Sequence, residues 1–266
     1  MTELVDFRIR CPSCQREVLS RANGREARCA ACEIRYPIEA GVLQLLPPGS
    51  ERRTLAQAAM EWPPLVRIYE SRLWRRNPVF ALALGISFER ECALITEAAA
   101  LRADHHALDL ACGSGNYARR FARTVSQGTV VGLDLSAPML THGQRKADAQ
   151  GLRNLQLVRG DAMELPFEDG RFDLVNCCGA LHLFPSVPKV LGEIARVLRP
   201  GGRFTAAVVG RAEHERAERN TARRRAASGV DAFTPAQLCG LLEVAGLGEA
   251  AFPHEGPRWL VVTAGG

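Results

Sequence analysis

The sequence predicts an α/β fold preceded by a small cysteine-rich module. Two observations support this prediction. From about residue 101 onward short apolar runs alternate with helical patterns, and two C-x2-C pairs lie within residues 1–46. Strands separated by helices favour a largely parallel sheet with helices on both faces. We expect three parts: the module at 1–46, a helical cover over a ligand site at 47–100, and an α/β core at 101–266 with an inserted segment at about 210–232.

The first element is the module, with cysteines at Cys11, Cys14, Cys29 and Cys32 and a hairpin expected to turn at Asn23-Gly24. Two such pairs suit tetrahedral zinc, and a segment this short needs a metal to order it. Four thiolates leave the ion no open position, so we expect a structural zinc-ribbon-like site. Disulfides would need an oxidising compartment, for which nothing in the sequence argues.

Composition places the chain among globular proteins. It has 266 residues, of which 47% are hydrophobic and 24% charged. No apolar run approaches the roughly 20 residues of a membrane span, and the first residues lack the apolar region of a signal peptide. We therefore expect a cytoplasmic protein. The net charge of +5 comes almost entirely from arginine and carries little weight as a sign of nucleic-acid binding.

Six apolar runs in the core are expected to be strands. They are HALDLAC, TVVGLDL, LQLVRGD, FDLVNCC, GRFTAAVV and RWLVVTA. Helical patterns lie between them, and Pro200-Gly201-Gly202 predicts the end of the helix in VPKVLGEIARVLRPGG. Ligands of parallel sheets bind at the carboxyl ends of the strands, so the residues that follow these runs are the candidate site.

The first run leads into Gly113 and Gly115, which is typical of a loop that approaches a nucleotide-like ligand. A dinucleotide fingerprint also tolerates Ala118 at its third position, so the glycines alone leave the ligand open. Asp134 ends the second run and can accept from two ribose hydroxyls. Asp161 ends the third run, where it can accept from the adenine amine. No basic residue is placed at the glycine loop to meet a pyrophosphate, which favours S-adenosylmethionine as the cofactor.

The motifs LDLACGSG, VVGLDLSAPML, GDAMELPFEDGRFDLV and EIARVLRPGG, in this order over about residues 105–210, resemble those of class I S-adenosylmethionine-dependent methyltransferases. The resemblance implies a Rossmann-like, seven-stranded, mostly parallel sheet with one antiparallel strand at the end. It also implies a set of cofactor contacts. These are Ala111, Gly113 and Gly115 along the methionine part, Asp134 at the ribose, Leu135 and Met139 against the adenine, Asp161 and the backbone of Ala162 at the adenine edge, and the backbone around Cys177 and Cys178 at the methionine amino group.

Three side chains near this site have alternative roles. Asp161 can instead cap a helix, and Asp109 can orient the glycine loop rather than touch the ligand. His182, in GALHLFP after the fourth run, lies on the side to which the methyl group should point. We expect His182 to act as a base or to orient the methyl acceptor; its alternative role is a hydrogen-bonded wall residue.

The methyl acceptor is suggested by the combination of parts. The cysteine pairs, YESRLWRRNP and GALHLFPSVPKVLGEIARVLRPGG are similar to a methyltransferase group of plastids and bacteria, and LRPGG with its preceding helix resembles quinone-pathway and natural-product methyltransferases. The layout also resembles the ribosomal RNA guanine-N1 methyltransferases, but the fourth ligand here is cysteine and CCGALHLFP replaces an Asn- and Pro-rich motif. We expect a small-molecule acceptor of secondary or quinone-type metabolism. An RNA base methyltransferase that docks through its ribbon is the alternative, and a non-catalytic cofactor-binding protein is a third possibility.

Two further segments have uncertain roles. Trp62, Tyr69 and Trp74 can form an apolar lid over the cofactor or take part in ordinary helix packing. The segment 210–229 has six arginines and three glutamates, which can grip an anionic substrate or a phosphate backbone, or form a solvated helix.

Overall fold

The computed structural model describes residues 8–16, 18–46, 77–211 and 229–265. Its strands are β1 (Ser20–Asn23), β2 (Glu26–Arg28), β3 (Arg35–Glu39), β4 (Val42–Gln44), β5 (His106–Leu110), β6 (Thr129–Asp134), β7 (Leu155–Arg159), β8 (Phe172–Cys178), β9 (Leu198–Val209), β10 (Glu249–Glu255) and β11 (Trp259–Gly265). Its helices are α3 (Pro78–Leu84), α4 (Phe88–Ala99), α5 (Asn116–Thr124), α6 (Ala137–Ala149), α7 (Val187–Val197) and α9 (Pro235–Val244), with a 3-10 turn, η1, at Leu181–Leu183. None of the described helices is long and apolar enough to cross a membrane.

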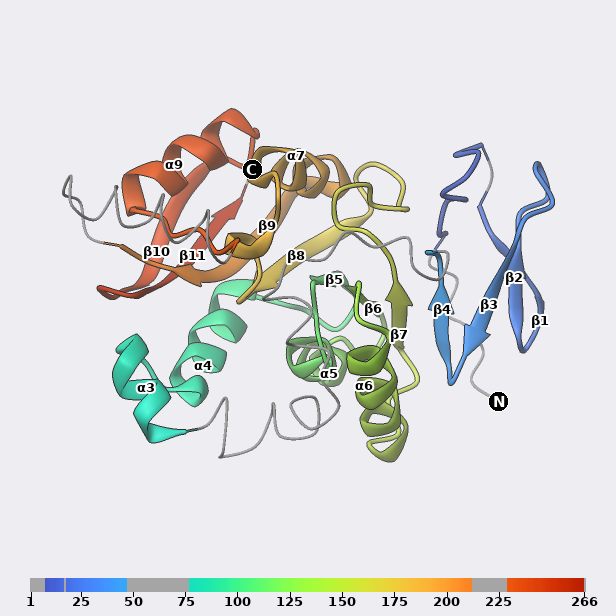
Figure 1. Ribbon diagram of the computed structural model, residues 1–266, viewed down its shortest axis with the longest axis horizontal. Coiled ribbons are helices and arrows are strands. Elements are labelled where there is room, and N and C mark those ends of the chain that lie inside the picture. Colours follow the sequence, from blue (N-terminus) through green and yellow to red (C-terminus); the bar gives the residue numbers. More distant parts are fainter. Residues whose placement is uncertain (1–7, 17, 47–76, 212–228, 266) are drawn as a thin grey trace.

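The strands form one sheet in the order β1-β2-β3-β4-β7-β6-β5-β8-β9-β11-β10 (Figure 1). Its centre, β7-β6-β5-β8-β9, is parallel, and β11 runs antiparallel between β9 and β10. The central strands are the apolar runs of the sequence, and they are buried along nearly their whole length. Such continuous burial is what a parallel sheet covered on both faces requires.

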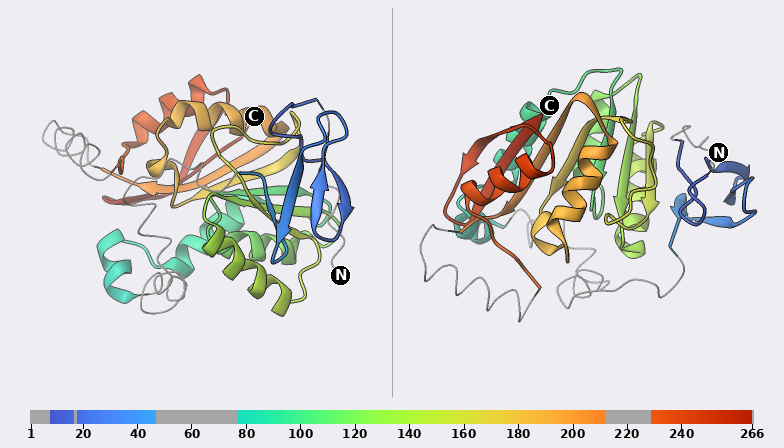
Figure 2. Two further views of the ribbon diagram at one scale, coloured as in Figure 1. Left: turned by 45° about the vertical axis from the view of Figure 1, so that its right-hand side comes forward. Right: turned by 90° about the horizontal axis from the view of Figure 1, so that it is seen from above.

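The expectation of seven strands is wrong for the described chain, where the sheet has eleven. The four added strands come from the N-terminal module: β4 pairs in parallel with β7, with Leu43 opposite Val158 and Gln44 opposite Arg159. The right-hand view of Figure 2 shows these strands at one end of the row and β10 at the other. Without β4, the unpaired N–H and C=O groups of β7 would form an exposed edge. Pairing between segments so distant in sequence is not visible in local patterns.

The six expected strands are present as β5 to β9 and β11, whereas β10 was not expected. Its residues alternate between exposed and half-buried at the sheet's end, and it contains Pro253. The expected hairpin of the module is present as β1 and β2, but its turn lies at Gly24-Arg25, one residue later than predicted. The helix before Pro200 ends as predicted, at Val197.

Helices cover both faces of the sheet. Figure 1 shows α4, α5 and α6 on one side and α7 and α9 on the other. Each side has its own apolar core. The first contains Phe88, Tyr117 and Phe121, and the second contains Phe172 and Leu191.

Three expectations concern residues outside the described chain. The aromatic lid of Trp62, Tyr69 and Trp74 and most of the arginine-rich segment at 210–229 lie there. Of the expected 47–100 cover, α3 and α4 are described, with α4 packed against β9 and β11. The division into three parts stays a prediction.

Candidate cofactor site and cysteine cluster

The glycine loop, residues 111–115, follows β5 at the carboxyl edge of the parallel strands. Ala111, Gly113 and Gly115 all adopt left-handed backbone angles, with φ of 52°, 54° and 73°. A Cβ added at Gly113 would meet nothing within 4 Å, so the backbone there faces open space. Backbone exposed in this way lets a ligand approach more closely than a side chain would permit.

Asp134, the last residue of β6, lies directly against this loop. Its Oδ2 accepts from the Gly113 N–H at 2.7 Å, and its Oδ1 accepts from the Ser136 N–H at 2.8 Å. Burial raises the pKa of Asp134, and these two N–H groups oppose the rise. A carboxylate has about four acceptor positions, so Asp134 can hold the loop and still accept from a ligand hydroxyl.

Asp109 is 2% exposed, and both of its carboxylate oxygens form hydrogen bonds within the fold. Its Oδ2 accepts from the Ala118 N–H at 2.8 Å and its Oδ1 from Asn176 Nδ2 at 2.7 Å. Burial, with a smaller contribution from Asp134, raises the pKa of Asp109 to about 7. The side chain therefore anchors the first turn of α5, which corresponds to the loop-orienting alternative.

The residues expected around the adenine lie beyond Asp134 at the same edge. Leu135 is half-buried, whereas Met139 and Ala162 are buried. Asp161 accepts from the Met163 N–H at 2.8 Å within a turn, and no helix begins there. This is a local Asx-type bond, and it leaves the carboxylate with further acceptor capacity toward the edge of a base.

His182 lies in η1, after β8, and is 6% exposed. Its Nδ1 accepts from the Val209 N–H at 3.4 Å, and its ring packs edge-on against Trp259 with centroids 5.9 Å apart. A neutral imidazole that accepts at Nδ1 carries its proton on Nε2. In this arrangement Nε2 is a donor, which suits the orienting role better than the base role.

Glu91 is a buried carboxylate that the sequence reasoning missed. It is 1% exposed on α4 and accepts from the Tyr117 hydroxyl at 2.6 Å and from Trp259 Nε1 at 2.7 Å. Burial raises the pKa of Tyr117 well above its usual range. The spacing of Phe88, Glu91 and Ile95 puts Glu91 on the apolar face of α4, and this spacing could have identified it.

The four module cysteines form one cluster. Their sulfur atoms all lie within 4.8 Å of one another, with 3.6 Å between Cys11 and Cys32 and 3.6 Å between Cys14 and Cys29. Zinc–sulfur bonds of about 2.3 Å in a tetrahedron place sulfur atoms about 3.8 Å apart. The donor set therefore fits a zinc ion.

Two matched turns place these cysteines. The Gln15 N–H donates to the Cys11 carbonyl at 2.9 Å, and the Glu33 N–H donates to the Cys29 carbonyl at 3.0 Å. Gln15 and Glu33 each adopt a left-handed φ, of 57° and 61°. Burial raises the pKa of Cys11, but hydrogen bonds from Tyr36 and backbone N–H groups outweigh it and lower the pKa to about 6. A thiolate at neutral pH is the form that binds metal.

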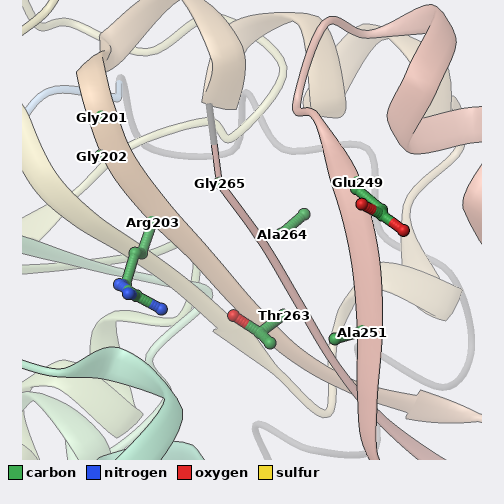
Figure 3. Close-up of a pocket in the computed structure, with 8 residues that line it drawn as sticks. All are labelled: Gly201, Gly202, Arg203, Glu249, Ala251, Thr263, Ala264 and Gly265. Atoms are coloured by element: carbon green, nitrogen blue, oxygen red, sulfur yellow. The ribbon is translucent and has the colours of Figure 1, made fainter.

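A separate cavity of about 330 Å³ lies at the amino-terminal ends of the parallel strands, where β9 begins and the antiparallel β11 ends (Figure 3). Gly201 and Gly202 line it together with Arg203 and Glu249. Strands β8 and β9 are parallel, so the start of β9 is far from the edge that holds the glycine loop. This cavity is distinct from the candidate cofactor site.

Comparisons with known proteins identify the domain. Residues 107–202 match a family described as a methyltransferase domain. A demethylmenaquinone methyltransferase of Bacillus cereus is 41% identical over 122 residues, which cover 44% of this chain and 52% of that protein. The match thus spans only about half the length of this relative.

Solved structures agree on the fold. The YcgJ protein of Bacillus subtilis is similar with a TM-score of 0.57 and 25% identity, over 62% of this chain and 71% of that one. Phosphoethanolamine N-methyltransferase 2 of Haemonchus contortus, solved with S-adenosyl-L-methionine, gives a TM-score of 0.64 at 17% identity, over 82% of this chain and 61% of that one. Residues 107–202 therefore match a methyltransferase domain family, and the chain shares the fold of solved S-adenosylmethionine-dependent methyltransferases.

Proposed function

We propose that this chain transfers a methyl group from S-adenosylmethionine to a small molecule of quinone-type or secondary metabolism. The observation that carries the proposal is the contact between Asp134 and Gly113, which places a carboxylate beside open backbone at the carboxyl edge of the sheet. The relative named for demethylmenaquinone supports the acceptor class.

The cofactor would supply an activated methyl group on a sulfonium sulfur. Asp134 would accept from the ribose hydroxyls, and Asp161 with the Ala162 backbone would bind the adenine edge. The backbone at Ala111, Gly113, Gly115 and Cys178 would lie along the methionine part. Binding both reactants in one orientation and excluding water would then account for much of the acceleration.

His182 would orient the acceptor. Its Nε2–H can donate to an acceptor oxygen, because Nδ1 is occupied by the Val209 N–H. His182 also contacts Trp259, whose Nε1 donates to Glu91 at 2.7 Å. Positioning of an oxygen in this way would align the attacking atom with the methyl group.

The four cysteines would bind a structural zinc ion, which completes the proposed set of groups.

An RNA acceptor is less well supported by the module's charges. Arg8, Arg28 and Arg35 each form an ion pair with a glutamate, so these three arginines do not present unpaired charge to a phosphate backbone.

The test measures transfer of labelled methyl groups from S-adenosylmethionine into three acceptors: a demethylated quinol, a small-molecule extract and ribosomal RNA. We expect label in the quinol or the extract, and much less label with the Asp134→Ala variant at a cofactor concentration below saturation. Label in RNA alone would replace the proposed acceptor with the RNA alternative, and cofactor binding without label in any acceptor would support a non-catalytic role.

A further inference from the structure

The N-terminal module contacts the segment that is proposed to bind adenine. We name residues 160–168, between β7 and β8, the adenine loop; it contains Asp161 and Ala162. Gln15 Nε2 donates to Glu164 Oε1 at 2.8 Å, and the Arg10 N–H donates to the Pro166 carbonyl at 2.9 Å. Arg8 and Glu168 form an ion pair at 3.2 Å. The module therefore contacts the adenine loop at three residues, Glu164, Pro166 and Glu168.

A second connection runs through Arg159, the last residue of β7, which is 8% exposed. Its Nη1 donates to the Leu46 carbonyl at 3.4 Å, just beyond β4. Its Nε donates to the Leu135 carbonyl at 3.2 Å, next to Asp134. The Leu45 N–H also donates to the Arg159 carbonyl at 2.9 Å. Arg159 thus joins the end of the module to the segment that is proposed to hold the ribose and adenine.

The two parts also share an apolar core. Ile9, Tyr36 and Leu43 of the module belong to the same buried cluster as Leu165 and Phe167 of the adenine loop. Apolar contacts of this kind order the module and the adenine loop together, because unfolding of either one exposes apolar surface of the other to water. The shape of the adenine loop therefore depends on the folded state of the module.

The folded state of the module depends in turn on the cysteine cluster. Gln15 follows Cys14 directly, and its left-handed backbone is part of the turn that presents Cys11 and Cys14. So small a module gains much of its order from a bound metal ion. Loss of the ion would release this turn and with it the hydrogen bond from Gln15 to Glu164.

We propose that the module is a metal-dependent brace for the adenosine half of the cofactor site, so that zinc binding and cofactor binding strengthen each other. Gln15 and Arg159 act as positioning residues, because they hold the loop without touching the cofactor. This proposal rests on the proposed function. Linkage is reciprocal: the factor by which zinc raises cofactor affinity equals the factor by which the cofactor raises zinc affinity.

The first experiment compares the affinity for S-adenosylhomocysteine by calorimetry in four preparations: the zinc-loaded full chain, the chain after zinc removal, and the variants Gln15→Ala and Arg35→Ala. We expect zinc removal to weaken binding by about tenfold or more. Gln15→Ala keeps all four cysteines, so it should retain zinc and weaken binding by about threefold to tenfold. Arg35→Ala removes a module ion pair that is remote from the adenine loop, and it should bind normally.

The second experiment measures zinc affinity of the wild-type chain by competition with a chelator, with and without saturating S-adenosylhomocysteine. The ligand should raise zinc affinity by the same factor that calorimetry gives. Equal zinc affinity in both conditions, or a Gln15→Ala variant that binds like wild type, would overturn the brace. If the zinc-loaded wild type does not bind S-adenosylhomocysteine at all, the proposed function fails instead. The zinc-loaded Gln15→Ala variant keeps the metal, so poor folding of the zinc-free chain does not prevent the test.

Discussion

Asp134 Oδ2 accepts from the Gly113 N–H at 2.7 Å, so one carboxylate both shapes the glycine loop and faces the space beside it. Asp134 ends β6 and Gly113 lies in the loop after the neighbouring parallel strand β5, and only the shared carboxyl edge of these strands brings the two residues together. Removal of this carboxylate would take away the proposed ribose acceptor and the support of the loop in one step.

We expect Asp134→Ala to weaken cofactor binding by roughly tenfold to a hundredfold, because two ribose hydroxyls lose their charged acceptor. Titration calorimetry with S-adenosylhomocysteine measures the change. Glu243→Ala, an exposed carboxylate on α9, is the control and should bind normally. Unchanged affinity in Asp134→Ala would remove the cofactor assignment.

The buried pair of Asp109 and Asn176 should make stability depend on pH. The pKa of Asp109 is raised from 3.8 to about 7, so between these values the folded chain keeps a proton that the unfolded chain has lost. The stabilisation is complete below about pH 4 and is lost as the pH rises to about 7, at up to about 1.4 kcal/mol per pH unit. Urea unfolding from pH 4.5 to 7.5 measures this slope, which Asp109→Asn should reduce.

A matched double variant checks the geometry of that pair. Asp109→Asn alone sets an amide donor against Asn176 Nδ2 and should lower the free energy of unfolding. Adding Asn176→Asp restores a donor and an acceptor, and Thr205 Oγ1 can still donate to the new carboxylate as it does to Asn176 at 2.9 Å. The double variant should recover part of the loss; a loss equal to the sum of the single variants would contradict the pairing.

Metal binding should stabilise the module. We expect Cys29→Ser to lose zinc, measured by a colorimetric assay, and to lower the melting temperature, because the remaining ligands cannot order so short a segment. Cys239→Ser, at an exposed position on α9, is the matched control and should keep both properties. A Cys29→Ser chain without metal that melts like wild type would make the site incidental.

Glu91 should contribute to stability through its two buried donors. Glu91→Ala leaves the Tyr117 hydroxyl and Trp259 Nε1 without this partner, which should lower the free energy of unfolding by about 2–4 kcal/mol. Glu97→Ala, exposed on the same helix, should change it by less than about 0.5 kcal/mol. Chemical denaturation of the three chains side by side measures the difference, and equal stability would show that the buried pairings are weak.

His182 should affect turnover rather than cofactor binding. We expect His182→Ala to lower turnover by about a hundredfold with nearly unchanged affinity for S-adenosylhomocysteine. His182→Gln keeps an N–H donor near the Nε2 position, so it should recover part of the activity. Normal turnover in the alanine variant would make His182 a wall residue. If neither variant is active, the requirement is for the imidazole itself and the base role returns.

The sequence by itself determined the α/β class, six strands of the sheet and the cysteine pairs. These features follow from local patterns: apolar runs of strand length, glycines at left-handed turns, and C-x2-C spacing. A candidate ligand site at the ends of β5, β6 and β7 was also predictable, because parallel strands bring their carboxyl ends to one edge.

Tertiary structure alone decided which side chains meet. The pairing of β4 with β7, the bond from Gln15 to Glu164 and the position of Glu91 between Tyr117 and Trp259 all join segments that are distant in the chain. The same holds for Asp109, whose oxygens bind Ala118 and Asn176. Local propensity carries no information about such pairs, because the free energy of burial and hydrogen bonding depends on packing across the whole fold.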